Sequence, residues 1–208
     1  MGTKNGTTVR DGPTFIEAAR RKQILEAAVE TIAEVGFANA SLAQIGKRAG
    51  ISKSVIGYYF PSKDDLVRAV VDNFFLAGHE EMMEHLKTAT SAGELLRRYV
   101  RQNMLYIAGN RTATRAVSEI IANFRTPDGE PVYRLQDSEP LIQGTAAMFD
   151  WGQQTGEFRE HDSRVMAVML RGAMDTFSIH LAAYPDLDVE HYIAEVTDLF
   201  VGATRRTS

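Results

Sequence analysis

One stretch rich in histidine and glutamate could bind a metal ion or carry acid–base chemistry. It contains His79, Glu80, Glu81, Glu84 and His85. The spacing does not match His-Glu-x-x-His, and the two histidines are six residues apart, so they face different sides of a helix. A solvated acidic helix face is therefore the better interpretation, and we expect no metal site here.

No other residues form a recognisable catalytic arrangement. The chain has no cysteine, which excludes a disulfide scaffold, a thiolate zinc site and a cysteine nucleophile. It also lacks a phosphate-binding glycine loop and a Gly-x-Ser-x-Gly elbow. We therefore expect a protein that is not an enzyme, with no catalytic residues and no cofactor.

Residues 41–63, SLAQIGKRAGISKSVIGYYFPSK, suggest a different chemistry, the recognition of DNA. They predict two short helices joined by a tight turn. Gly46 is small enough for the helices to pack closely, and Gly50 tolerates unusual backbone angles in the turn. A small core between these helices is expected from Leu42, Ile45, Ile51 and Ile56.

The second of these helices presents cationic, hydroxyl and small apolar side chains on its outer face. They are Lys53, Ser54, Val55 and Tyr58. Such side chains suit insertion into the major groove, where they meet base edges and thymine methyl groups. Ser41, Tyr58 and Lys63 lie near helix ends, where phosphate contacts are expected.

Residues 57–66, Gly-Tyr-Tyr-Phe-Pro-Ser-Lys-Asp-Asp-Leu, resemble the signature of TetR-family regulators. In that signature a helix-turn-helix leads into an aromatic pair, Phe-Pro-x-Lys, an acidic residue and an apolar one. Residues 21–28, 36–37 and 41–45 also match, so the resemblance covers about residues 20–70. It implies an N-terminal DNA-binding head joined to an all-helical body that senses a ligand and dimerises.

The resemblance also implies individual roles. Lys53, Ser54 and Val55 would approach bases, while Ser41, Tyr58 and Lys63 would hold phosphates. The DNA-binding set that we expect is Ser41, Ser52, Lys53, Ser54, Val55, Tyr58, Tyr59 and Lys63. A ring that faces the core is the alternative for Tyr59. The chain departs from the family at Gly46, usually alanine, and at Gly57, often a larger residue, so one potential DNA contact is missing.

The elements that position these residues are helical throughout. Apolar residues recur at helical spacing, and glycines and prolines fall between the periodic segments, which predicts an all-α protein of about nine helices. The expected helices are 15–35, 41–49, 52–60, 62–86, 92–108, 112–124, 131–155, 163–183 and 189–203. We expect a flexible tail over 1–14, a helix-turn-helix DNA-binding domain over 15–62, and a ligand-binding and dimerisation domain over 63–208.

Most aromatic and methionine residues of the body fit the core of a helical bundle. A subset could instead line an apolar cavity for a small-molecule effector. The candidates are Phe74, Tyr99, Tyr106, Phe124, Trp151 and Asp175. Arg171 and Asp175 are four residues apart and could pair across one helical turn. With His180, they could serve the core, a dimer seam or a ligand.

The family resemblance implies a homodimer formed by the last two long helices. The apolar residues expected at this seam are Met166, Leu170, Ala173, Phe177, Leu181, Ile193, Val196, Leu199 and Phe200. Two-fold symmetry of the dimer then predicts a palindromic operator on double-stranded DNA.

The charge distribution agrees with a DNA-binding head. Residues 1–68 contain 10 basic and 7 acidic side chains, whereas residues 69–208 contain 13 and 20. A basic head on an acidic body favours binding to a polyanion at one end. The sequence shows neither a secretory signal nor an apolar run of about 18 residues, so we expect a cytoplasmic protein without membrane contact.

These features together predict a ligand-responsive DNA-binding transcriptional regulator. The simplest version is a repressor that a small apolar or amphipathic effector releases from a palindromic operator. Two alternatives stay open. One is a helical protein that binds or senses a ligand without operator-specific DNA binding, and the other is a helical enzyme that uses the body cavity. The sequence is compatible with both repression and activation.

Overall fold

The computed structural model describes residues 15–206, and within that range the chain folds into nine α-helices and one short 3-10 helix. The helices are α1 (Phe15–Val35), α2 (Leu42–Ala49), α3 (Lys53–Tyr59), α4 (Lys63–Leu86), α5 (Ala92–Gly109), α6 (Arg111–Asn123), η1 (Leu135–Ser138), α7 (Glu139–Gln154), α8 (Ser163–Ala183) and α9 (Val189–Thr204). The prediction of an all-α fold is confirmed. The tail expected over 1–14 lies outside the described residues.

Most helix boundaries follow directly from local sequence signals. The side chains of Ser41, Ser52, Ser62 and Ser91 each accept a hydrogen bond from the backbone N–H three residues later, which caps α2, α3, α4 and α5. Gly50 ends α2 in the left-handed conformation, with φ 66°. These caps explain why the predicted bounds of α2, α3, α4 and α5 agree with the structure.

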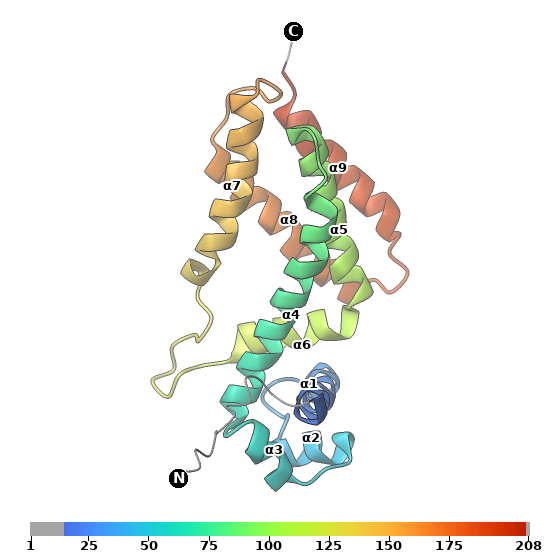
Figure 1. Ribbon diagram of the computed structural model, residues 1–208, viewed down its shortest axis with the longest axis vertical. Coiled ribbons are helices and arrows are strands. Elements are labelled where there is room, and N and C mark those ends of the chain that lie inside the picture. Colours follow the sequence, from blue (N-terminus) through green and yellow to red (C-terminus); the bar gives the residue numbers. More distant parts are fainter. Residues whose placement is uncertain (1–14, 207–208) are drawn as a thin grey trace, which may run out of the picture.

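The helices pack around two separate cores (Figure 1). The first core lies in the head and combines residues of α1, α2 and α3 with the first half of α4 and one face of α6. The second lies in the body, among α5, α7, α8 and α9. Since α4 runs from the head into the body and α6 lies between them, no flexible linker separates the two parts.

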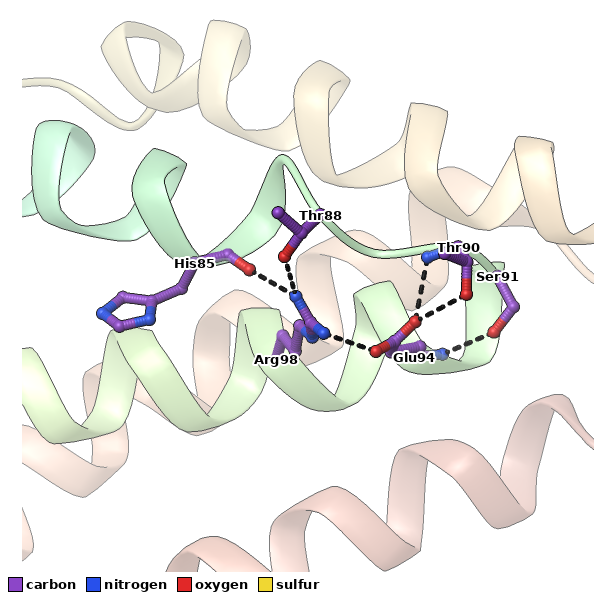
Figure 2. Close-up of polar contacts among 6 residues, drawn as sticks. All are labelled: His85, Thr88, Thr90, Ser91, Glu94 and Arg98. Carbon is purple, nitrogen blue, oxygen red and sulfur yellow. Dashed lines mark hydrogen bonds and ion pairs between the residues drawn. The ribbon is translucent and has the colours of Figure 1, made fainter.

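A polar cluster fixes the far end of α4 on α5 (Figure 2). The Arg98 guanidinium donates to the His85 carbonyl oxygen at 2.9 Å, to the Thr88 hydroxyl at 2.6 Å and to the Glu94 carboxylate at 2.5 Å. Glu94 also accepts the Thr90 amide at 2.9 Å, and this hydrogen bond lowers the pKa of Glu94. The Arg98 guanidinium therefore ties the body end of α4 to α5.

The predicted helix 131–155 begins too early. In the structure α7 starts at Glu139, after a turn and the short helix η1. The Val132 amide donates to the Phe124 carbonyl oxygen at 3.0 Å, and the Thr126 amide donates to the Glu130 carbonyl oxygen at 2.8 Å. These bonds close a turn after α6. Together with the antiparallel bridge between Arg125 and Pro131, they hold residues 131–132 in a paired, non-helical conformation, so the helix begins later.

Candidate nucleic-acid interface and ligand cavity

The close approach of α2 to the turn depends on Gly46. A Cβ at this position would lie 2.8 Å from the Ile51 carbonyl oxygen, closer than real side chains come to backbone atoms. The Ile51 amide in turn donates to the Gly46 carbonyl oxygen at 2.9 Å. Ile45 and Ile56, both fully buried, fill the space between the two helices and α1. The expected requirement for a small residue at position 46 is confirmed.

Helix α1 holds both helices of this unit by polar contacts. The Gln23 side chain donates to the Ala49 carbonyl oxygen at 2.7 Å, at the end of α2. The Arg21 guanidinium donates to the Tyr59 carbonyl oxygen at 2.9 Å and lies 4.3 Å from the centre of the Phe60 ring, at the end of α3. Contacts with α1 thus fix the orientation of α3 on one side and leave its opposite side uncovered.

The free side of α3 carries the residues expected to meet base edges. Lys53, Ser54 and Val55 are exposed, and Tyr58 is 74% exposed although it is a large aromatic residue. The Gly57 position has open space around it, since a Cβ added there would have nothing within 4 Å. The result is a short, uncovered helix face with a cationic and hydroxyl-bearing first turn.

Two of the expected DNA contacts point elsewhere in the structure. Tyr59 is half-buried and packs against the head core, so its ring follows the core-facing alternative. The Lys63 ammonium donates to the Phe37 carbonyl oxygen at 2.8 Å and lies 4.5 Å from the centre of the Phe37 ring. Burial lowers the pKa of Lys63. Ser41 and Ser52 are exposed, and their hydroxyls serve as helix caps.

Sequence reasoning did not find a joint between head and body around Phe37. The Phe37 ring lies 5.5 Å from that of Phe124, which follows α6. The Glu119 carboxylate of α6 accepts the Phe37 amide at 3.5 Å and the Asn123 side chain at 3.3 Å. Together with Lys63, these contacts connect the start of α4, the loop after α1 and the end of α6. No sequence pattern joins positions so far apart along the chain.

The body contains a cavity of about 180 Å³ between α4, α5, α6 and α8. Four of the six residues expected at a ligand site line it, namely Phe74, Tyr99, Tyr106 and Asp175. The cavity shares several lining residues with a larger open groove of about 1360 Å³ that extends along α6 and α8 toward the head. A ligand in the cavity could therefore extend into the groove.

The other two expected ligand residues lie away from the cavity. Phe124 is buried in the head core, beside Phe37 and Tyr133. Trp151 is half-buried and packs against the body core formed by α5, α7, α8 and α9. Helical spacing places an aromatic residue on an apolar face but does not tell which of two cores that face meets. Neither Phe124 nor Trp151 therefore lines the cavity or the groove described above.

The two tyrosines at the cavity already have intramolecular partners. The Tyr106 hydroxyl donates to the Phe74 carbonyl oxygen at 2.7 Å, and burial raises the pKa of Tyr106. The Tyr99 and Thr145 hydroxyls are 2.8 Å apart and hydrogen-bonded. These phenols contribute ring surface to the cavity, but their hydroxyl groups are engaged within the fold.

The polar end of the cavity is formed by Arg171 and Asp175 on α8. The closest nitrogen–oxygen distance between them is 4.0 Å, so the predicted pair is present but loose. The Arg171 side chain is 21% exposed, whereas that of Asp175 is 75% exposed. His180 lies further along α8, stacked edge-on to Tyr184 and Tyr192, and lines neither the cavity nor the groove.

The residues predicted at a dimer seam lie mostly inside the protomer. Leu170, Phe177, Leu181, Ile193 and Phe200 are buried in the body core, and Met166, Ala173 and Val196 pack against it. Of the predicted set, Leu199 alone is exposed. Helix α8 has a second apolar face that was not predicted, with Val165, Val168, Met169 and Ile179 exposed by 40% to 66%. Apart from Leu199, the predicted seam residues therefore face the protomer's own helices wholly or in part.

Two further kinds of site can be tested within residues 15–206. The described side chains contain no group of three or more histidine, cysteine, aspartate or glutamate residues that could hold a metal ion. None of the helices described is both long enough and apolar enough to cross a membrane.

Comparison with known proteins identifies the head. Residues 24–70 match the model of the family described as bacterial regulatory proteins, tetR family. These residues comprise most of α1, all of α2 and α3, and the start of α4. The head of this chain therefore matches the TetR family. The resemblance of residues 20–70 to that family is thereby confirmed.

Similar proteins and solved structures agree with that result. The HTH-type transcriptional regulator BetI 1 of Chromohalobacter salexigens is 43% identical over 56 residues, which cover 27% of this chain and 28% of that protein. FadR from Bacillus subtilis, in complex with stearoyl-CoA, superposes with TM-score 0.71 and 25% identity over 88% of this chain and 99% of FadR. AibR, in complex with isovaleryl coenzyme A and operator DNA, superposes with TM-score 0.70 and 19% identity over 86% of this chain and 97% of AibR.

The match to BetI 1 covers little more than a quarter of either protein, and the family model covers residues 24–70. The structural matches extend over nearly the whole chain, including the helical body. The head is therefore recognisable from sequence, and the body is recognisable from its fold.

Proposed function

We propose that this chain is a ligand-responsive transcriptional repressor that acts as a cytoplasmic homodimer and not as an enzyme. The single observation that carries the proposal is the uncovered face of α3, held rigidly by α1 and α2. The comparison with AibR supports it, since AibR has the same fold and was solved with operator DNA and a small molecule. The rival, a ligand-binding protein without operator-specific DNA binding, would leave this face without a purpose.

Within this proposal, Lys53, Ser54 and Val55 contact base edges in the major groove, and Tyr58 contacts a phosphate. Ser41 and Ser52 lie at the helix N-termini, where a backbone phosphate is favoured by the free N–H groups and the helix dipole. Lys63 has a different role, because its ammonium group is bound to the Phe37 carbonyl oxygen. We assign it to the joint between head and body.

The proposed dimer forms through the outer face of α8 and not through the residues buried in the protomer. Val165, Val168, Met169 and Ile179 give this face an apolar surface of the kind that oligomers cover. A two-fold arrangement would present two copies of α3 to successive major grooves, and the operator would then be a palindrome.

The effector acts, in this proposal, by changing the packing between α4 and α6. Both helices line the cavity, and both are tied to the head through Lys63, Glu119 and Phe124. A ligand that separates them disturbs the Phe37 joint. DNA affinity then falls to the extent that the ligand prefers the disturbed state. FadR, with its bound stearoyl-CoA, supports a small-molecule site in a body of this fold.

Selection from randomised duplex DNA tests this proposal directly. The purified protein is incubated with the pool, bound fragments are recovered and amplified over several rounds, and the enriched sequences are read. We expect a palindrome whose half-sites are about 10 base pairs apart, or a multiple of that spacing. A pool that shows no enriched sequence after selection would refute operator reading and favour the rival.

A further inference from the structure

We propose that the cavity binds an anionic amphiphile, with an apolar end among the aromatic residues and its anionic group on Arg171. This inference rests on the proposed effector site and assigns the chemical class of its ligand. It excludes neutral apolar molecules as the preferred effectors.

The inner part of the cavity is apolar and aromatic. Phe74, Phe75, Met82, Val117 and Met174 contribute to its lining. At a volume of 180 Å³, and at about 30 Å³ per water-sized group, it has room for about six such groups. A short hydrocarbon segment fits this space.

Arg171 is the half-buried cation of the cavity, and it lacks a good partner. A guanidinium has five N–H donors, and its removal from water is costly unless they are used. The Arg171 side chain is 21% exposed, and it contacts Asp175 at 4.0 Å and the Met174 sulfur at 3.7 Å. Neither is a strong hydrogen bond. Asp175 is 75% exposed, so its carboxylate can turn into water when another anion approaches.

The carboxylates of the adjoining groove do not compete for Arg171. Glu30 and Glu34 both pair with Arg48, and Glu119 accepts from Asn123 and Phe37. The groove also contains Arg115, for which the described part of the chain offers no hydrogen bond or ion pair. Arg171 at the cavity and Arg115 in the groove thus each have unused donors, which suits a carboxylate or a phosphate.

Isothermal titration calorimetry on the full chain without DNA tests the assignment. The probes are hexanoate, hexyl phosphate and hexan-1-ol, which share an alkyl segment and differ in the head group. We expect at least one anion to bind about 10- to 100-fold more tightly than the alcohol, the usual range for a charge-assisted pair. The ratio between hexanoate and hexyl phosphate distinguishes a carboxylate ligand from a phosphate ester.

Variants locate the effect. Arg171→Gln should remove the preference for the anion, whereas Asp175→Asn should strengthen anion binding several-fold because it removes the competing carboxylate. Arg97→Gln, a change on α5 at a residue that lines neither the cavity nor the groove, should leave all affinities unchanged. Opposite changes in anion affinity at two positions one helical turn apart cannot arise from loss of folding.

The proposal is overturned if the alcohol binds as tightly as both anions, if no probe binds at millimolar concentration, or if Arg171→Gln keeps the anion preference. Because no DNA is present, this failure is distinct from a failure of operator reading. A protein that selects a palindrome but binds no anion would keep the proposed function and lose the assigned ligand class.

Discussion

Gly46 and Gly57 each lie inside a helix of the DNA-binding head, and replacing either with alanine adds one methyl group. Their surroundings differ completely. A Cβ at Gly46 would lie 2.8 Å from the Ile51 carbonyl oxygen and 3.4 Å from the Ile56 side chain, whereas nothing lies within 4 Å of a Cβ at Gly57. The two substitutions therefore separate the effect of helix propensity from the effect of crowding.

The expected magnitudes follow from these distances. Alanine in place of glycine stabilises a helix interior by up to about 1 kcal/mol, and this gain applies to both variants. Gly46→Ala also pushes α2 away from the turn, and overpacking of this kind costs about 1–3 kcal/mol. Gly57→Ala should thus raise the free energy of unfolding. The free energy of unfolding of Gly46→Ala should be lower than that of Gly57→Ala by about 1–3 kcal/mol.

Urea denaturation of the two variants and the parent, followed by circular dichroism, measures this difference. The midpoints should shift at constant slope, since neither change alters the surface exposed on unfolding. Thermal midpoints of the two variants should differ by roughly 2–12 °C for a chain of this size. Equal stabilisation by both substitutions would refute the reasoning, because it would mean that the turn does not pack tightly on Gly46.

Three other predictions concern the joint, the dimer and the pH dependence. Phe37→Leu should lower the free energy of unfolding by about 1–2 kcal/mol in urea titrations, because it removes one aromatic pair and one cation–π contact. An unchanged free energy of unfolding would show that Phe37 does not stabilise the joint between head and body. Ile179→Glu should yield monomers by light scattering, and an intact dimer would exclude the outer face of α8. The Ala92 and Gly93 amides lower the pKa of Glu157 in the folded protein. The stability that this group contributes is therefore present above pH 4.5 and is lost as the pH falls below that value. Glu157→Gln should flatten this acid limb of the stability curve, and an unchanged limb would be the contrary result.

The head was predictable because its signals are local. Serine caps, the glycine after α2 and the proline after α3 act within one helical turn, so their consequences can be read from adjacent residues. The outer face of α3 followed from the same short-range pattern. Tyr59 and Lys63 were harder to place, because their orientation depends on Phe37 and on the head core, which are distant in sequence.

The body was predictable as helices but not as contacts. Helix α8 has one apolar face on the body core, through Leu170 and Phe177, and another that is exposed, through Met169 and Ile179. Hydrophobic spacing detects both faces and cannot assign either to a partner. Phe124 was misplaced for the same reason, since α6 serves the head core on one side and the cavity on the other.

The reading of DNA by α3 is the central claim, and fluorescence anisotropy with a selected duplex across a salt series tests it most directly. Lys53→Ala should weaken binding and reduce the slope of log affinity against log salt by about 1, as expected for the loss of one cation at the interface. Lys87→Ala, which removes the same charge from the exposed far end of α4, should change neither. Equal losses in the two variants, or a slope that Lys53→Ala leaves unchanged, would contradict the account.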